Sequence, residues 1–258
     1  MPKRDDEKRG LEPTRFVEEA HTFGYWYQTV RGYLGETAVG RRSEAPEVQL
    51  SEPERQALIT VLCSYCVGET VALEGSSGLI SFAPNRVSKI FLSTQVVDEG
   101  RHVEVFLHRL RELGVADPDV EIDRRANRNL LEFRKRLLEL IAQQDWEAAL
   151  FAQNVILEGM EFAVFNAHAE MADPVTRELL LGVVRDERRH IEFGEASLER
   201  LLQVAPHRRA HLRAVKQELD HLVLATFEQT AREIGGDRTG EVELGRAYLI
   251  ATRRLGLA

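Results

Sequence analysis

The pattern Asp-Glu-x-Arg-His-(Val/Ile)-Glu occurs twice in the chain, at residues 98–104 and 186–192. Each copy places a Glu three residues before a His: Glu99 with His102, and Glu187 with His190. Residues three apart share one face of a helix, and here apolar residues recur on that face at the helical period. A buried carboxylate is costly unless it is paired or binds a metal. The repeat therefore predicts two helices that aim a carboxylate and an imidazole into a buried di-metal site.

Two further Glu residues stand at matching distances before this repeat. Glu69 precedes Glu99 by 30 residues and Glu158 precedes Glu187 by 29, and both lie on apolar helical faces. Equal spacing suits two antiparallel hairpins that return to the same depth of a four-helix bundle, where each helix supplies one Glu. The 59 residues from Glu99 to Glu158 leave room for a long crossover. We therefore predict an all-α bundle with four Glu and two His in its core.

This ligand order, Glu…Glu-x-x-His…Glu…Glu-x-x-His, resembles that of the ferritin-like di-iron carboxylate proteins over roughly residues 55–202. The Asp-Glu-x-x-His form is most similar to the oxygen-activating branch, which includes monooxygenase hydroxylases, desaturases, ribonucleotide reductase small subunits and ligand-binding oxidases. The resemblance implies a ferritin-like four-helix bundle with extra N- and C-terminal helices. It also implies two iron ions, or a Mn/Fe pair, with O₂ as co-substrate. The implied ligands are Glu69, Glu99 and His102 for one metal, and Glu158, Glu187 and His190 for the other.

Further residues gain a role from the same resemblance. Asp98 and Asp186 precede the repeated Glu, and are expected to accept from His190 and His102 respectively; the alternative is a solvated helix charge. Glu161 stands three after Glu158, as does an extra ligand in rubrerythrins; the alternative is an ion pair with an Arg. Tyr65 lies one turn before Glu69 and is a candidate to hydrogen-bond a ligand. An apolar substrate pocket is expected from Tyr65 and the aromatic residues Phe106, Phe151, Phe162 and Phe165.

Residues at individual positions exclude several members of the oxygen-activating branch. Phe106 stands where reductase subunits have a radical Tyr, and Gln153 stands where ligand-binding oxidases have a cross-linking Tyr. Val183 and Phe162 replace the distinguishing His of arylamine N-oxygenases and the Thr of monooxygenase hydroxylases. The sequence is therefore expected to encode a stand-alone oxidase or oxygenase that acts on a small organic molecule and takes electrons from an external donor. Hydroxylation, N-oxygenation and desaturation all remain open as the reaction type. The alternatives are a Mn/Fe ligand-binding oxidase-like protein and a non-catalytic metal-binding or iron-handling protein.

The expected elements follow from periodicity and from Gly, Pro and capping residues. Residues 1–12 read as a disordered tail and 13–258 as one helical domain with its metal-binding core at about 53–203. In the aromatic stretch 13–39, Trp26 or Tyr27 could line a substrate pocket; the alternative is a helix packed across the bundle. The bundle and its flanking helices are expected at 52–73, 86–113, 120–142 (the crossover), 144–172, 175–203, 207–233 and 240–254, with a break at residues 74–78.

Composition limits the class of function. The net charge of −8 over 258 residues argues against binding to nucleic acid, which favours a basic surface. No apolar run approaches a membrane span and the start lacks the apolar core of a secretory signal, so we expect a cytoplasmic protein without a membrane partner. Cys63 and Cys66 lack the further ligands of a zinc site and are expected to be buried core residues. A homodimer is compatible with such a bundle.

Overall fold

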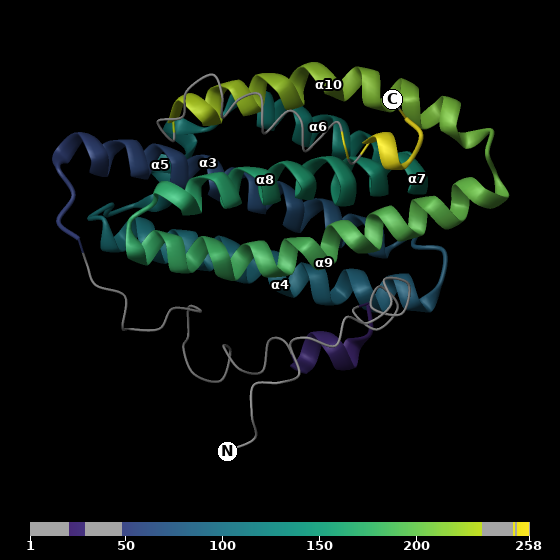
Figure 1. The fold of residues 1–258 in the computed structure, drawn as a ribbon, viewed down its shortest axis with the longest axis horizontal. Helices are drawn as coiled ribbons and strands as arrows, with labels where there is room; N and C mark the ends of the chain where they lie inside the picture. The colour runs from purple at the N-terminus through teal and green to yellow at the C-terminus, as the bar shows by residue number, and fades with distance from the viewer. Residues whose placement is uncertain (1–20, 29–47, 234–249, 251, 258) are drawn as a thin grey trace.

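The computed structural model describes residues 21–28, 48–233, 250 and 252–257 (Figure 1). Within those residues every regular element is helical, which confirms the all-α prediction. The elements are α3 (Glu52–Ile80), α4 (Arg86–Glu112), α5 (Pro118–Arg125), α6 (Arg128–Ala142), α7 (Trp146–Leu150), the π-helix η2 (Phe151–Leu157), α8 (Glu158–Met171), α9 (Pro174–Val204) and α10 (Arg208–Glu233). The expected tail at 1–12, and most of the expected helices at 13–39 and 240–254, lie outside the described residues.

The bundle consists of two helical hairpins, as the spacing of the Glu residues predicts. Helix α3 packs along α4, and α8 packs along α9, while α4 and α9 also touch each other. Helix α6 lies against α3, and α10 covers α6 and α8 on the outer side, along the top of Figure 1. Residues 21–28 lie on the opposite side, beside α4 and α9. This arrangement places the middle of four long helices around one core.

Local capping explains where the long helices begin. The backbone N–H of Ser51 donates to Glu54 Oε2 (2.8 Å) at the start of α3. The Asn85 side chain accepts from the Ser88 N–H (2.9 Å) at the start of α4. The Asp173 side chain accepts from the N–H of Val175 (3.0 Å) before α9. These polar residues are local signals, and the helix starts therefore agree with those expected.

The predicted break at residues 74–78 is wrong, because α3 continues to Ile80. The two glycines in this stretch permit close packing instead of ending the helix. A Cβ on Gly75 would lie 2.0 Å from Gln153 Oε1, and one on Gly78 would lie 2.8 Å from Ile141 Cγ2. Neighbouring helices thus occupy the space that side chains at these positions would need.

Two of the expected helices are also divided differently. The crossover expected at 120–142 is two helices, α5 and α6, because the Asn127 side chain caps a new start by accepting from the N–H of Asn129 (3.0 Å) and Leu130 (3.4 Å). The helix expected at 144–172 begins at Trp146 and contains the π-helical segment η2 in its middle. π-Helical turns are rare and often mark functional positions.

The core is apolar and continuous through the bundle. Cys63 and Cys66 are free and buried in it, as predicted, and burial raises the pKa of the Cys63 thiol to about 11. Of the described helices, Glu52–Ile80 and Trp146–Met171 are long and apolar enough to cross a membrane, contrary to the expectation that no such run exists. However, 72% and 83% of their most apolar windows are buried inside the bundle, as in core helices of globular proteins.

Replacing Gly194 by alanine should destabilise the fold where α9 packs against η2. A Cβ there would lie 2.5 Å from Asn154 Cβ and 3.2 Å from its backbone, so α9 and η2 must separate. We expect the free energy of unfolding to fall by about 1–3 kcal/mol, measured by denaturant unfolding. The matched control is Gly182→Ala on the same helix, where nothing lies within 4 Å of the new Cβ. Equal denaturation midpoints for the two variants would contradict this account.

Candidate metal centre

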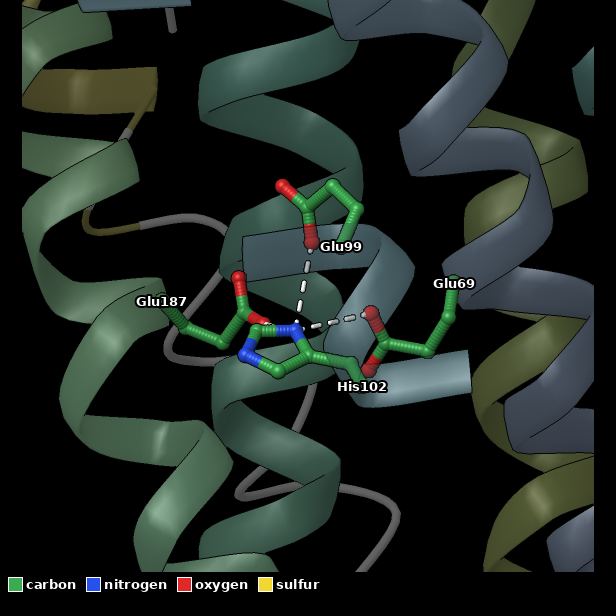
Figure 2. A group of neighbouring side chains, drawn as sticks. All are labelled: Glu69, Glu99, His102 and Glu187. Carbon is green, nitrogen blue, oxygen red and sulfur yellow. Dashed lines mark hydrogen bonds and ion pairs between the residues drawn. The ribbon is translucent and has the colours of Figure 1, made fainter. Parts of the chain in front are cut away.

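The structure brings the six predicted Glu and His side chains together in the middle of the bundle. They form two groups whose donor atoms lie within 4.8 Å of one another: Glu69, Glu99, His102 and Glu187; and Glu99, Glu158, Glu187 and His190. Figure 2 shows the first group. All six side chains are completely buried. Because Glu99 and Glu187 belong to both groups, they are placed to bridge two ions, and each group contains one His.

Both histidines direct Nδ1 into this cluster. His102 Nδ1 lies 3.1 Å from Glu69 Oε2, 3.2 Å from Glu99 Oε2 and 3.0 Å from Glu187 Oε1 (Figure 2). His190 Nδ1 lies 3.2 Å from Glu99 Oε1, 3.2 Å from Glu187 Oε2 and 3.5 Å from Glu158 Oε2. An imidazole in this position can offer a lone pair to a metal while its other nitrogen is held from outside.

The other ring nitrogens contact the aspartates that precede the repeated Glu. His102 Nε2 lies 3.3 Å from Asp186 Oδ2, and His190 Nε2 lies 3.3 Å from Asp98 Oδ2, so each contact crosses from one copy of the motif to the other. Both contacts were expected from the sequence, and both carboxylates are buried. Arg101 donates to Asp186. Such a carboxylate sets the tautomer and orientation of a metal-bound His.

A residue from the N-terminal stretch supports one of these aspartates. Trp26 Nε1 donates to Asp98 Oδ1 (2.9 Å), and the Arg189 guanidinium lies 3.5 Å from the other oxygen of Asp98. Trp26 is half-buried, and neither it nor Tyr27 lines a described cavity. Sequence reasoning singled out Trp26 for its aromatic surroundings but missed this role. No local pattern in the sequence connects residue 26 with residue 98.

Buried amides hold Glu158 and were also missed. Gln95 Nε2 donates to Glu158 Oε1 (2.6 Å), and Gln153 Nε2 donates to the same oxygen (2.7 Å). Asn154 Nδ2 in turn donates to Gln95 Oε1 (2.8 Å) and to the backbone oxygen of His190 (3.1 Å). Polar residues that recur on an apolar face were the available signal, since buried amides need partners.

The electrostatics of the cluster reflect crowding of acids. Burial, and then the neighbouring Glu158, raises the pKa of Glu99 to about 8, and the same causes raise the pKa of Glu187 well above its usual value. Burial disfavours the His102 imidazolium, but the carboxylates of Glu69 and Glu187 outweigh it and raise the His102 pKa. Without cations the cluster therefore retains protons that carboxylate ligands would have to give up.

The donor set fits a pair of divalent cations. Among the described residues, five ligand oxygens have no hydrogen-bond partner: Glu69 Oε1, Glu99 Oε1, Glu99 Oε2, Glu158 Oε2 and Glu187 Oε1. Buried oxygens of this kind normally bind something. Four carboxylates neutralise two divalent ions, and mixed oxygen and imidazole donors suit iron or manganese. The cluster therefore has the composition and geometry of a dinuclear metal centre.

Glu161 lies beside the cluster but belongs to neither four-residue group. Its Oε1 rests against Gly68, where a Cβ would lie only 2.3 Å away, and neither of its oxygens has a hydrogen-bond partner among the described residues. Burial, together with the charges of Glu69 and other ligands, raises the pKa of Glu161 well above its usual value. The structure thus places Glu161 next to the centre as a buried acid outside the two four-residue groups.

Among the described residues the Tyr65 hydroxyl bonds to His168 and not to a ligand, contrary to the expectation. The hydroxyl lies 2.9 Å from His168 Nδ1, and both side chains are buried. Tyr65 and Phe165 line a small cavity of about 30 Å³, together with Glu161. Phe106 packs against both rings, with centroids 5.5 Å from Tyr65 and 5.7 Å from Phe165, but does not line that cavity.

The two remaining phenylalanines lie elsewhere. Phe151 is fully buried in η2 and Phe162 is half-buried on α8, and neither lines that cavity. A larger open hollow of about 570 Å³, next to His21 and Arg200, contains none of the six ligands. Of the expected pocket residues, Tyr65 and Phe165 are therefore the ones that the structure places at an apolar cavity near the centre.

Solved structures of other proteins have a similar fold. One is a protein with aldehyde deformylating oxidase activity from Synechococcus, with 23% identity, a TM-score of 0.69, and coverage of 80% of this chain and 92% of that one. Another is an R2-like ligand-binding oxidase with a Mn/Fe cofactor, with 15% identity, a TM-score of 0.72, and coverage of 95% and 97%. At these identities the likeness establishes the ferritin-like fold.

The family comparison is more specific. Residues 53–247 match the long-chain fatty aldehyde decarbonylases. The matched region contains all six clustered ligands, both aspartates and the amides that hold Glu158. Because the match spans well over half of the chain, the protein belongs to the long-chain fatty aldehyde decarbonylase family, and it is an oxidoreductase of the ferritin-like di-iron superfamily.

Proposed function

We propose that the protein is an O₂-dependent oxidase that uses two iron ions, or a Mn/Fe pair, to oxidise a small organic substrate with electrons from an external donor. The observation that carries this proposal is the pair of four-residue groups that share Glu99 and Glu187. Two ions held so closely would supply the binding and reduction of O₂. Storage of iron would not need two histidines, each fixed by its own buried aspartate.

The protein's own side chains would prepare this chemistry. Asp98 and Asp186 hold the Nε2 atoms of the histidines, so Nδ1 of each ring stays directed at the ions. Gln95 and Gln153 fix one oxygen of Glu158 and leave the other facing the cluster. The surrounding apolar core excludes water, which limits side reactions of a reactive centre.

We further propose an aldehyde with an apolar chain as the substrate class. Family membership supports this choice, as does the lining of the small cavity, which includes Leu130, Met160, Val164 and Phe165. A cavity of about 30 Å³ holds no more than one or two water molecules. An alkyl chain would therefore have to displace lining side chains, among which the flexible Met160 yields most easily.

The test is a reaction of the ferrous protein with O₂. Protein loaded anaerobically with Fe(II) should contain two ions per chain, and should turn from colourless to near-ultraviolet-absorbing when O₂ is added. With a reductant and a series of aldehydes, O₂ consumption should rise and a hydrocarbon one carbon shorter should form. Hydroxylated, N-oxygenated or desaturated products would assign a different reaction to the same centre. Uptake of many irons per chain without turnover would instead indicate iron storage and overturn the proposal.

The identity of the metal pair needs its own measurement. A Mn/Fe cofactor is present in the R2-like ligand-binding oxidase, which resembles this chain over nearly its whole length. Metal-free protein should be offered Mn(II) and Fe(II) together and then exposed to O₂. The metals retained after desalting would distinguish an Fe/Fe centre from a Mn/Fe centre.

A further inference from the structure

Two hydrogen-bonded pairs cross the wall between the small cavity beside the metal centre and a hollow at the surface. We call the first the inner cavity; its lining includes Ser64, Tyr65 and Glu161. We call the second the outer hollow; it is about 200 Å³ in volume, and its lining includes Glu54, His168, Asp173 and Glu233. Tyr65 meets His168, and the neighbouring Ser64 donates to Glu233 Oε2 (3.1 Å). Each pair therefore joins a residue that lines the inner cavity to a residue that lines the outer hollow.

The ring of Tyr65 in the Tyr65–His168 pair is closely packed. The Tyr65 ring meets Phe165 edge-on at a centroid distance of 4.7 Å, and Phe106 packs against it at 5.5 Å. The hydroxyl lies 2.9 Å from His168 Nδ1, a distance at which a proton can pass between oxygen and nitrogen. Burial lowers the pKa of His168 to about 4, so the ring is neutral at physiological pH and has one nitrogen to donate and one to accept.

The inner end of this pair lies close to the metal ligands. Tyr65 is one helical turn before Glu69 on α3, so both side chains project from the same face of the helix. The inner cavity also contains the carboxyl group of Glu161, which rests against Gly68, the residue next to Glu69. Its volume of about 30 Å³ allows one or two water molecules to stand between Tyr65 and Glu161.

The outer end is acidic. Glu54, Asp173 and Glu233 line the outer hollow together with His168. Carboxylates at a surface opening attract cations, including hydronium, and so raise their local concentration. Protons taken from solvent at this opening thus have a short path inward through His168.

We propose that Tyr65 and His168 conduct protons from the outer hollow to the inner cavity while the metal centre reduces O₂. The proposal rests on the proposed function, since reduction of O₂ to water takes up one proton for each electron that the external donor supplies. A proton from solvent binds His168 Nε2 as the Nδ1 proton passes to the Tyr65 oxygen, and the phenolic proton passes to water in the inner cavity. Reorientation of both groups restores the starting state, so neither residue changes its charge or oxidation state.

The neighbouring Ser64–Glu233 pair provides a matched control. Ser64 lines the same cavity and also bonds to a residue of the outer hollow, but its hydroxyl donates outward to a carboxylate. An inward transfer through it would require Glu233 to be protonated first. In the absence of an aldehyde, Ser64→Ala should therefore leave the rate of O₂ reduction unchanged. Tyr65→Phe preserves the packed ring and removes only the relay hydroxyl.

The experiment compares the full-length wild type, Tyr65→Phe, His168→Ala and Ser64→Ala, each loaded with two Fe(II) per chain. Stopped-flow absorbance after mixing with O₂ gives the rate, and a pH-indicator dye gives the rate of proton uptake. We expect both rates to fall on the order of 100-fold in Tyr65→Phe and His168→Ala. Added imidazole, which fits the open outer hollow, should restore His168→Ala but not Tyr65→Phe. 1-Methylimidazole, which lacks the N–H, should restore neither.

A second measurement uses metal-free protein and so does not depend on turnover. Exchange of the Tyr65 phenolic proton with D₂O can be followed by the isotope shift of the ¹³C-labelled ring. It should be slower in His168→Ala than in wild type, and imidazole should restore it. If the wild type fails to react with O₂, the proposed function is overturned. The exchange measurement then still tests whether Tyr65 and His168 conduct protons.

Several results would overturn the relay. One is that Tyr65→Phe and His168→Ala, each with two metals bound, react with O₂ as fast as the wild type does. Another is a loss of rate in Ser64→Ala equal to that in Tyr65→Phe, and a third is a slow His168→Ala that imidazole does not accelerate. If His168→Ala does not fold, Tyr65→Phe decides the question, because its ring contacts are retained.

Discussion

Replacing Glu99 by alanine should abolish binding of both metal ions, whereas replacing Glu69 should abolish binding of only one. Glu99 belongs to both four-residue groups, and its two oxygens lie 3.2 Å from the two different histidines. Glu69 belongs to one group. Loss of a bridging carboxylate removes a ligand from each ion and leaves the cluster with too little negative charge to neutralise both. Metal content per chain after desalting, measured by elemental analysis, checks this difference.

The chain offers a close control in Glu104, which lies five residues after Glu99 in the same motif and is exposed. Glu104→Ala should retain two ions per chain. His190→Ala should lose at least the ion of the second group, because that group contains no other imidazole. Two ions per chain in both Glu99→Ala and His190→Ala would show that the assigned side chains are not the ligands, whatever their proximity.

Metal binding should become tighter as the pH rises toward 8, and should release protons. The pKa of Glu99 is raised to about 8 by burial and by Glu158, and the pKa values of Glu187, His102 and His190 are raised as well. Each must lose its proton before it can ligate, so protons compete with metal ions below these pKa values. The interactions of Glu158 with Glu187, His190 and Gln153 outweigh its burial and lower its pKa to about 2, so this carboxylate is already ionised and does not contribute to the pH dependence.

The stability of the metal-free protein should change with pH in the opposite direction. A carboxyl with a pKa raised from 4.5 to about 8 binds more protons in the folded state than in the unfolded state, so stability falls as the pH rises between those values. The raised pKa values of His102 and His190 act with the same sign, since the protonated form is the one stabilised. Bound ions replace those protons. The gap in Tm between loaded and metal-free protein should therefore widen with pH.

Both effects are measurable with one preparation. Calorimetric titration of Mn(II) or Fe(II) in buffers of different ionisation enthalpy, at pH values below and near 8, gives affinity and released protons together. Thermal unfolding of the same samples gives the Tm gap. A binding constant that is independent of pH, or a Tm gap that narrows as the pH rises, would contradict the crowding of acids inferred for the cluster.

Helical periodicity explains why the six ligands of the metal centre could be predicted from the sequence. A spacing of three residues places Glu99 with His102, and Glu187 with His190, on common faces whatever the rest of the fold does. Matching spacing between hairpins then brings Glu69 and Glu158 to the same depth. Such signals lie within one element or in the distance between equivalent elements, and they require no knowledge of packing.

The side-chain contacts that the sequence did not predict join elements that no motif connects. The bond from Trp26 to Asp98 and the pair of Tyr65 with His168 join residues 72 and 103 positions apart, with no motif to connect them. Glycines mislead for the same reason: Gly75 has the appearance of a helix break, but the space beside it is taken by Gln153 from another helix. Tertiary packing decides between these interpretations, and a single sequence does not display it.

The π-helical segment η2 has a consequence for how this protein can vary in length. Its wider turns place Gln153 against Glu158, five residues later, at 2.7 Å. Deleting one residue between Gln153 and Glu158 would let this segment return to ordinary α-helical turns, because a π-helical turn accommodates one more residue than an α-helical turn. The two side chains would then stand four positions apart and still share one face of the helix. A deletion in the α-helical part, α8, would instead rotate the flanking segments by about 100° relative to each other. Homologous chains that are one residue shorter in this helix should consequently lack that residue within Phe151–Leu157.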